Sequence, residues 1–301
     1  MKKSLVTGAG GFIGHHLVNS LKASGHTVTG VDVKHPEFEP SRADRFVIHD
    51  IRKETEDWLR LFEGVDEVWA LAADMGGMGF ISRNHVMIMR NNVMINLNTL
   101  EAAKKAKVKR YLYTSSACVY PENLQTEIDA LPLKESMAFP ANPQDGYGWE
   151  KLYTEKLCYY YRQEHGLETS VVRFHNMYGP LGTWKGGREK APAALCRKVA
   201  EAILTKKDRI EIWGDGEQTR SFCYVDDCVK GLRLLMESGF SGPLNLGRDE
   251  MVSINELADL IMKIAGVRLG KVHVEGPQGV RGRNSDNSLC KKFWDGVQRS
   301  I

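Results

Sequence analysis

Four side chains in the middle of the sequence could carry acid-base and redox chemistry. Ser116 and Cys118 follow one expected strand, and Tyr147 and Lys151 lie four residues apart further along the chain. Residues at that spacing share one face of a helix, so we expect the Lys151 ammonium beneath the Tyr147 phenol. Its charge should lower the pKa of the phenol toward neutrality and make Tyr147 a usable base for a hydroxyl group. The same spacing also occurs on solvated helices, so the pair needs a cofactor site beside it.

A dinucleotide-binding pattern opens the chain. A short strand, residues 2–7, runs into Gly8-Ala9-Gly10-Gly11-Phe12-Ile13-Gly14 and an apolar helix. Gly8 permits a tight turn, Gly11 lets a pyrophosphate approach the backbone, and Gly14 lets the helix pack close to the sheet. The helix N-terminus then faces the phosphates.

An acidic residue follows at the expected distance. A second strand, residues 27–32, ends at Asp32, about 20 residues after the glycine turn, where dinucleotide sites hold the ribose hydroxyls. A carboxylate there repels a 2′-phosphate, which predicts NAD rather than NADP. The alternative is that Asp32 is an ordinary turn residue.

Composition narrows the class of protein. The formal net charge of the 301 residues is +3, which favours neither a nucleic-acid-binding nor a membrane-surface protein. The six cysteines show no C-x-x-C spacing, so we expect no metal site and reduced thiols in the cytoplasm. No apolar run has the length of a membrane span, and the first strand leaves no room for a signal peptide.

Strands and helices alternate through the first half of the chain. Further strands are predicted at residues 45–50, 65–72, 110–114 and 168–174, and the clearest helix at 87–107. This order is typical of an α/β fold with a Rossmann-type, doubly wound parallel sheet, which binds ligands at the carboxyl ends of its strands. Four residues follow predicted strands and should face one crevice: Asp50, Ala72, Ser116 and Asn176.

A change in composition marks a second, smaller lobe. From Gly179 the chain is rich in Gly, Pro, Lys and Arg, as expected for a substrate-binding lobe. A strand at 221–225 and the helix after it should return to the first domain. We therefore predict an NAD-binding domain at 1–177 plus 221–247, and a smaller α/β nucleotide-sugar-binding lobe at 178–220 plus 248–301.

Several motifs resemble one enzyme superfamily. The glycine turn, the Ser116, Tyr147 and Lys151 set and the turn 176–180 resemble the extended short-chain dehydrogenase/reductases that act on nucleotide sugars. Segments 72–80, 182–192, 213–222 and 279–287 are similar, almost letter for letter, to the GDP-mannose 3,5-epimerase family. The resemblance covers nearly the whole chain, and it implies NAD, a GDP-sugar substrate and a homodimer joined by helices of the parallel-sheet domain.

The resemblance also implies a reaction and residue roles. GDP-D-mannose would be oxidised at C4, inverted at C5 and C3, and reduced again to GDP-L-galactose, with GDP-L-gulose as a second product. Tyr147 would take the hydroxyl proton, Ser116 would hold the oxygen, and Lys151 would tune the phenol and bind the nicotinamide ribose. Cys118 would be the base and Lys190 the acid of the epimerisation.

The binding residues implied by the resemblance fall into two sets. The cofactor set is Gly8, Gly11, Phe12, Ile13, Gly14, Asp32, Asp50, Ile51, Ala72, Tyr147 and Lys151. The substrate set is Gly77, Ser116, Cys118, Asn176, Glu189, Lys190, Ala191, Lys198, Gln218, Arg220 and Arg283, with Arg283 on the pyrophosphate.

Alternatives remain open from the residues alone. Cys118 could be a structural thiol, and the cationic loop around Lys190 could bind phosphate. The enzyme could be a 4-epimerase, or a 3,5-epimerase of another GDP-sugar such as a GDP-heptose. The protein could also be a nonenzymatic sensor that binds NAD. A 4,6-dehydratase is disfavoured, because Ala117 and Cys118 stand where its acidic pair would be.

The sequence departs from the family pattern in two places. Glu217 and an expected helix at 200–207 alter the presumed guanine pocket, and the family commonly continues beyond Asp286 with a further helix.

Overall fold

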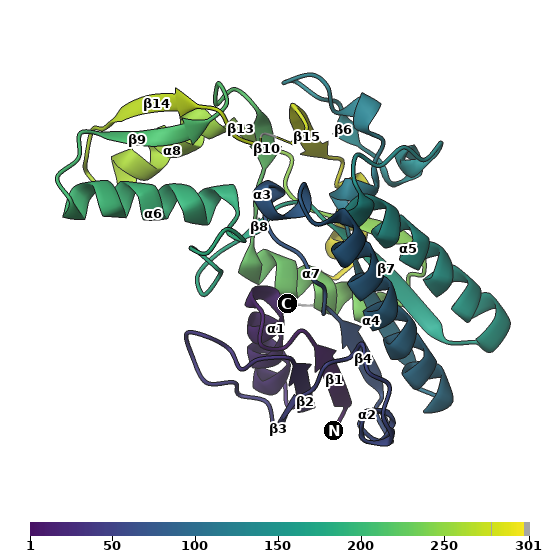
Figure 1. Cartoon of the computed structure of the whole chain (residues 1–301). Helices are drawn as coiled ribbons and strands as arrows, with labels where there is room; N and C mark the ends of the chain where they lie inside the picture. The colour runs from purple at the N-terminus through teal and green to yellow at the C-terminus, as the bar shows by residue number, and fades with distance from the viewer. Residues whose placement is uncertain (278, 298–301) are drawn as a thin grey trace.

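The centre of the protein is a parallel sheet of seven strands in the order β12-β7-β5-β4-β1-β2-β3 (Figure 1). The computed structural model describes residues 1–277 and 279–297. The order turns back between β1 and β4, the point at which doubly wound sheets bind their ligands. The strands are β1 (Lys3–Thr7), β2 (Thr27–Asp32), β3 (Arg45–Ile48), β4 (Glu67–Ala70), β5 (Arg110–Ser116), β7 (Glu168–Phe174) and β12 (Pro243–Leu246).

Helices cover both faces of this sheet, which explains why most residues of its central strands are buried. On β1, Leu5 joins the hydrophobic core beneath one layer of helices, and the next residue, Val6, joins the core beneath the other. Successive strand side chains point to opposite faces, so each strand contributes to both cores. One layer contains α2 (Glu56–Arg60), α4 (His85–Lys105) and α5 (Gly146–His165), and the other α1 (Phe12–Ala23), α7 (Val225–Ser238) and α9 (Ser288–Val297).

A second group of elements stands apart from the large sheet, at the upper left of Figure 1. Strands β9 (Arg209–Trp213) and β14 (Gly270–Val274) pair in parallel, and α6 (Ala191–Leu204) and α8 (Ile254–Ile264) pack with them around a separate core. We call these four elements the outer lobe. The remaining elements are short. They are α3 (Met78–Ile81), a sheet of β13 (Met251–Ser253), β10 (Thr219–Ser221), β15 (Gly282–Ser285) and β6 (Pro132–Leu133), the pair β8 (Met177–Tyr178) and β11 (Cys223–Tyr224), and the short helices η1 (Ala117–Val119), η2 (Glu122–Leu124) and η3 (Glu135–Ala138).

Two expectations about the second half of the chain were wrong. The strand expected at 221–225 is interrupted: β10 ends at Ser221, and β11 pairs with β8 instead of joining the large sheet. The seventh strand is β12, which pairs with β7, although helix α7 does return to the large sheet as expected. The helix expected at 200–207 begins at Ala191 and ends at Leu204. Its extension is prevented by Lys206, whose φ of 54° belongs to the left-handed region.

The predicted division into two lobes stays a prediction. The small strand β6 lies within the span assigned to the NAD-binding domain, yet it pairs with β15 from the span assigned to the substrate lobe. Residues 278 and 298–301 of that predicted lobe lie outside the described part of the chain.

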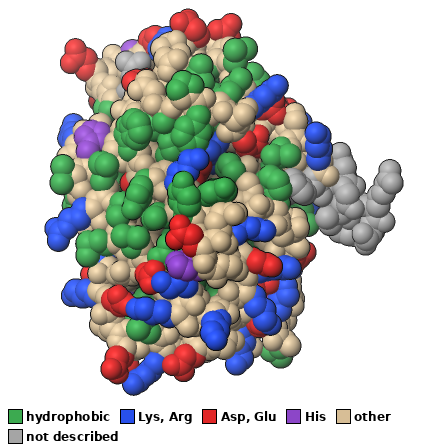
Figure 2. All heavy atoms as spheres, turned by 90° about the vertical axis from the view of Figure 1, so that its right-hand side faces the viewer, with side chains coloured by type: hydrophobic (Ala, Val, Ile, Leu, Met, Phe, Trp, Pro, Cys, Tyr) green, Lys and Arg blue, Asp and Glu red, His purple; other side chains and the backbone are tan. Residues whose placement is uncertain are grey.

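The helix layer of α4 and α5 carries an apolar outer surface. Figure 2 shows hydrophobic side chains gathered on this side of the molecule. Val86 and Met87 on α4 are exposed, as are Tyr153, Tyr159 and Tyr160 on α5. Among the described residues, none of the helices has the length and apolar character that crossing a membrane requires.

Candidate active site

A large cleft opens at the carboxyl ends of the parallel strands. Its volume is about 1530 Å³, and it extends from the glycine turn to the outer lobe. Every residue of the two predicted binding sets lines it: Gly8, Gly11, Phe12, Ile13, Gly14, Asp32, Asp50, Ile51, Ala72, Gly77, Ser116, Cys118, Tyr147, Lys151, Asn176, Glu189, Lys190, Ala191, Lys198, Gln218, Arg220 and Arg283. The fold therefore brings these residues together, while their individual roles stay predictions.

The glycine turn between β1 and α1 leaves no room for side chains. Gly8 has a φ of 71°, and a Cβ there would lie 2.8 Å from the backbone nitrogen of Ala72. A Cβ on Gly14 would lie 2.0 Å from the carbonyl oxygen of Gly8, so α1 packs directly against the turn. Its first N–H groups consequently face the cleft, where the positive end of a helix favours a pyrophosphate.

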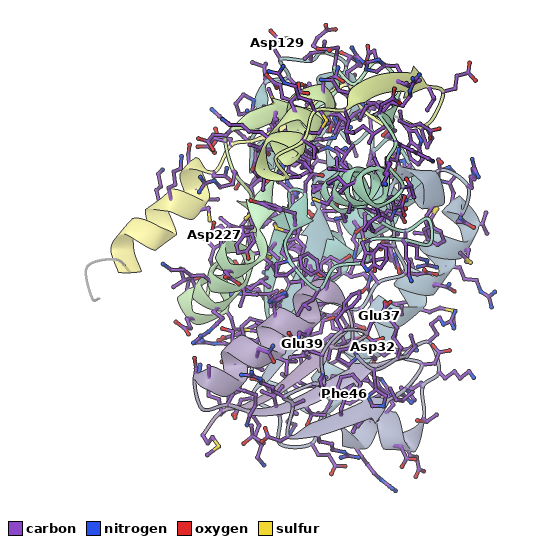
Figure 3. All side chains as sticks on the ribbon, turned by 90° about the vertical axis from the view of Figure 1, so that its left-hand side faces the viewer. Asp32, Glu37, Glu39, Phe46, Asp129 and Asp227 are labelled. Carbon is purple, nitrogen blue, oxygen red and sulfur yellow. The ribbon has the colours of Figure 1, made fainter. Side chains whose placement is uncertain are left out.

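Asp32 ends β2 beside this turn, in the purple N-terminal part of Figure 3. Its Oδ2 accepts a hydrogen bond from Gly10 N at 2.9 Å, and its Oδ1 accepts one from Val33 N at 2.7 Å. Burial raises the pKa of Asp32, and these backbone N–H groups oppose that rise. The carboxylate is thus fixed at the edge of the cleft. The turn and Asp32 together fit the diphosphate and ribose of a dinucleotide.

Tyr147 and Lys151 lie on the first turns of α5, as predicted. Asp145 caps this helix, since its Oδ1 accepts a hydrogen bond from Gly148 N at 2.8 Å. The Lys151 ammonium donates to Thr114 O at 3.1 Å and lies 5.5 Å from the centre of the Tyr147 ring. Lys151 is 2% exposed. The helix therefore holds the ammonium beneath the phenol.

The pKa of Tyr147 is raised in this structure and not lowered as predicted. Burial raises the pKa of Tyr147 well above its ordinary value, and the nearby Cys118 and Glu150 groups raise it further. A hydrogen bond with Ser116 lowers it only in part. Burial also lowers the pKa of Lys151, although Glu150, whose Oε1 lies 3.9 Å from its ammonium, opposes that change. The sequence argument counted the charge of Lys151 but not the desolvation of both groups.

Cys118 lies at the end of β5, two residues after Ser116. The Ser116 hydroxyl accepts a hydrogen bond from Cys118 N at 3.2 Å and so caps the short helix η1. Helix α5 packs tightly against this turn, because a Cβ on Gly148 would lie 2.2 Å from Cys118 O. The guanidinium of Arg283 donates to Cys118 Sγ at 3.4 Å. Arg283, predicted for the pyrophosphate, is thus placed on the thiol that the sequence proposed as a base.

Lys190 lines the same cleft as this thiol and interacts with it electrostatically. It is the N-cap of α6, and burial lowers the pKa of its ammonium while the Cys118 group raises it. The segment before it lies against the loop that carries Gly77, since Gly77 N donates to Arg188 O at 3.1 Å. The Arg188 guanidinium completes this contact by donating to Asp74 Oδ1 at 2.9 Å.

The remaining substrate residues surround the side of the cleft next to the outer lobe. Lys198 on α6 donates to Glu211 O at 2.8 Å, and burial lowers its pKa. Gln218 is 5% exposed, and within the described part of the chain its Oε1 has no hydrogen-bond partner. Asn176 donates to Ser221 O at 3.0 Å. Burial next to Arg283 lowers the pKa of Arg220.

Two features of the site were missed by the sequence prediction. Gln125 accepts a hydrogen bond from Arg283, and Asp74 pairs with Arg188. In each pair the two residues are more than a hundred positions apart in the chain, so no local pattern could have signalled either contact.

The comparisons with known proteins bear on this site. The model of the NAD dependent epimerase/dehydratase family matches residues 4–247. The chain belongs to this family. A predicted Rossmann-type α/β fold with NAD as cofactor is thereby confirmed.

Individual members of the epimerase/dehydratase family are similar over most of their length. GDP-mannose 3,5-epimerase of Arabidopsis thaliana is 53% identical over 292 residues, which are 96% of this chain and 76% of that protein. Among solved structures, UDP-glucose 4-epimerase of Thermotoga maritima with UDP-glucose is 28% identical with a TM-score of 0.86, over 96% of this chain and 91% of that one. UDP-glucuronic acid 4-epimerase of Bacillus cereus, in complex with UDP-glucuronic acid and NAD, is 28% identical with a TM-score of 0.79, over 97% and 93%.

Proposed function

We propose that this protein is a GDP-mannose 3,5-epimerase that converts GDP-D-mannose to GDP-L-galactose, with GDP-L-gulose as a second product. The observation that carries this proposal is that Cys118 and Lys190 line one cleft together with Ser116, Tyr147 and Lys151. A 4-epimerase needs only Ser116, Tyr147 and Lys151. The relative that is 53% identical supports the same substrate.

The C4 hydroxyl is the target of Ser116, Tyr147 and Lys151. Bound NAD would supply the acceptor for the C4 hydride, which leaves C4 as a ketone, and would give that hydride back at the end. Tyr147 takes the hydroxyl proton, and Ser116 donates a hydrogen bond to the C4 oxygen. Lys151 places a positive charge beside the phenol, which opposes part of the cost of burying the phenolate. The glycine turn and Asp32 hold the cofactor.

Cys118 and Lys190 act on the carbons beside the ketone. A ketone acidifies its neighbouring C–H groups, because the electrons left behind are delocalised onto oxygen. The Cys118 thiolate takes a proton from C5 or C3, and Lys190 returns a proton to the other face of the ring. Arg283 places a positive charge 3.4 Å from Cys118 Sγ, and burial brings the pKa of Lys190 closer to the working pH.

The nucleotide of the substrate lies, in this proposal, against the outer lobe. Lys198 and Arg220 supply charge for the diphosphate, and the unpartnered Gln218 Oε1 supplies an acceptor for a guanine N–H group. The predicted division therefore acquires a functional meaning: the large sheet binds NAD, and the lobe of 178–220 and 248–301 binds the nucleotide sugar.

Incubation of the purified protein with GDP-mannose in deuterated water, followed by proton NMR of the sugar, tests the proposal. Deuterium at C5 and C3 with formation of GDP-L-galactose is expected. Inversion at C4 alone, without deuterium at C3 or C5, would instead assign a 4-epimerase. Absence of exchange would exclude GDP-mannose and direct the test to other GDP-sugars.

We also propose a homodimer in the cytoplasm. The exposed apolar side chains on α4 and α5, among them Val86 and Tyr160, support a second copy packing on this face (Figure 2). The six unpaired cysteines support a reducing compartment. Analytical ultracentrifugation of wild type and Val86→Lys tests the dimer, since a charge at this contact should shift the protein toward monomer.

A further inference from the structure

A buried side-chain amide lies behind the Cys118 thiol and belongs to neither predicted binding set. Gln125 is 1% exposed. Its Nε2 donates to the carbonyl oxygens of Tyr120 and Pro121 at 3.2 and 3.1 Å, and its Oε1 accepts from Arg283 Nε. Two carbonyl acceptors require the NH₂ end of the amide on their side, so the oxygen must face the guanidinium.

The backbone of Gln125 holds the strand that carries this arginine. Its carbonyl oxygen accepts hydrogen bonds from Arg281 N at 2.9 Å and Gly282 N at 3.3 Å, where β15 begins. Arg283 itself is 9% exposed, so little water competes for its donors. One residue thus fixes both the start of the strand and the side chain of Arg283.

This support determines where the positive charge lies. A guanidinium is a planar fork, so an acceptor at Nε fixes the direction of the two terminal nitrogens. With Nε on Gln125, Nη1 lies 3.4 Å from Cys118 Sγ. The ionisable groups that also interact electrostatically with this thiol include Arg220 on β10, Lys190 before α6, and Tyr147 and Lys151 on α5.

We propose that Gln125 is a positioning residue for proton abstraction. It holds the Arg283 guanidinium against Cys118, where the positive charge stabilises a thiolate. The thiolate then takes a proton from a carbon beside the ketone, becomes a thiol, and leaves the C–H electrons in the enolate. This inference deepens the proposed function, because the role of Cys118 as base rests on it. The effect of Gln125 on the thiol does not depend on the substrate.

The reactivity of Cys118 toward iodoacetamide as a function of pH tests the inference. The thiolate displaces iodide, so the alkylation rate follows the thiolate fraction. The variant Gln125→Met keeps the side-chain length and removes the acceptor. Its half-maximal rate should move upward by about one pH unit, which is about a tenfold lower rate at a fixed pH below that midpoint. Mass spectrometry of the peptide that carries Cys118 separates it from Cys196, which is also accessible.

Two controls keep the result interpretable. Gln163→Met makes the same change at an exposed position of α5 and should leave the curve unchanged. Arg283→Gln should move the curve at least as far as Gln125→Met, and the double variant should move it no further than Arg283→Gln alone. A wild-type curve for Gln125→Met, or additive shifts in the double variant, would overturn the role of Gln125.

A folding defect and a wrong substrate are also distinguishable from failure of the inference. If Gln125→Met does not fold, Gln125→Asn provides the second variant, because it keeps the amide but is too short to bridge the carbonyl oxygens and Arg283, and should move the curve upward as well. An unmoved curve with Gln125→Asn would then overturn the inference. A protein that does not act on GDP-mannose would still give the predicted alkylation curves, so the two claims fail separately.

Discussion

Substituting Gly77 tests whether the two loops of the cleft position the acid of the epimerisation. A Cβ on Gly77 would lie 2.5 Å from Glu189 O, whereas ordinary contacts begin near 3.4 Å. The obstacle is backbone, so Gly77→Ala must push the loop before Lys190 away by about 0.9 Å. The φ of Gly77 is −71°, which alanine adopts without strain, so the effect is purely steric. A displacement of about 1 Å in a catalytic group costs on the order of a hundredfold in rate.

The assay for Gly77→Ala is kcat for GDP-mannose epimerisation, with bound NAD measured in parallel. The expected result is a kcat about a hundredfold lower with NAD binding unchanged, because the glycine turn lies elsewhere in the cleft. The matched control is Gly79→Ala, whose Cβ would meet Trp213 and Pro277 at ordinary contact distances of 3.6 and 3.8 Å. A kcat of Gly77→Ala within twofold of Gly79→Ala would refute the reasoning.

Three further predictions concern stability, pH and the cofactor. Glu155→Gln leaves the buried Arg173 charge without its carboxylate partner at 2.7 Å, which should cost about 3–5 kcal/mol of unfolding free energy; an unchanged urea midpoint would contradict it. Burial lowers the pKa of Lys190, so kcat should fall on the alkaline side at a pH below the ordinary lysine pKa, because the acid loses its proton there. Lys190→Arg should abolish this alkaline fall in kcat, and a fall that persists would assign it to another group. Asp32→Ala removes the fixed carboxylate at the ribose position and should weaken NAD binding about tenfold to a hundredfold by calorimetric titration, whereas an unchanged Kd would place the ribose elsewhere.

The large sheet could be predicted well because its signals are local. Strands β2 and β7 have the predicted bounds, since apolar runs between turn residues define a buried parallel strand. The interruption between β10 and β11 could not be predicted. Residues 221–225 read as one apolar strand, but the break depends on β11 pairing with β8, more than forty positions earlier in the chain. Such pairings are decided by tertiary packing rather than by propensity.

The catalytic site could also be predicted only in part. The spacing of Tyr147 and Lys151 on one helix face and the position of Ser116 at the end of β5 follow from sequence and fold class. The ionisation of Tyr147 did not, because desolvation depends on the whole packed environment. The contact of Arg283 with Cys118 was also out of reach, since it joins residues from β15 and η1.

The central claim is that Cys118 removes protons from carbons after Tyr147 has initiated oxidation at C4. Its most direct test is Cys118→Ala with GDP-mannose in deuterated water, with deuterium followed by NMR and NAD reduction by absorbance, and with Cys196→Ser as the matched control. The account predicts NAD reduction without deuterium at C3 or C5 in Cys118→Ala, and full exchange in Cys196→Ser. Deuterium incorporation by Cys118→Ala at the wild-type rate would contradict it.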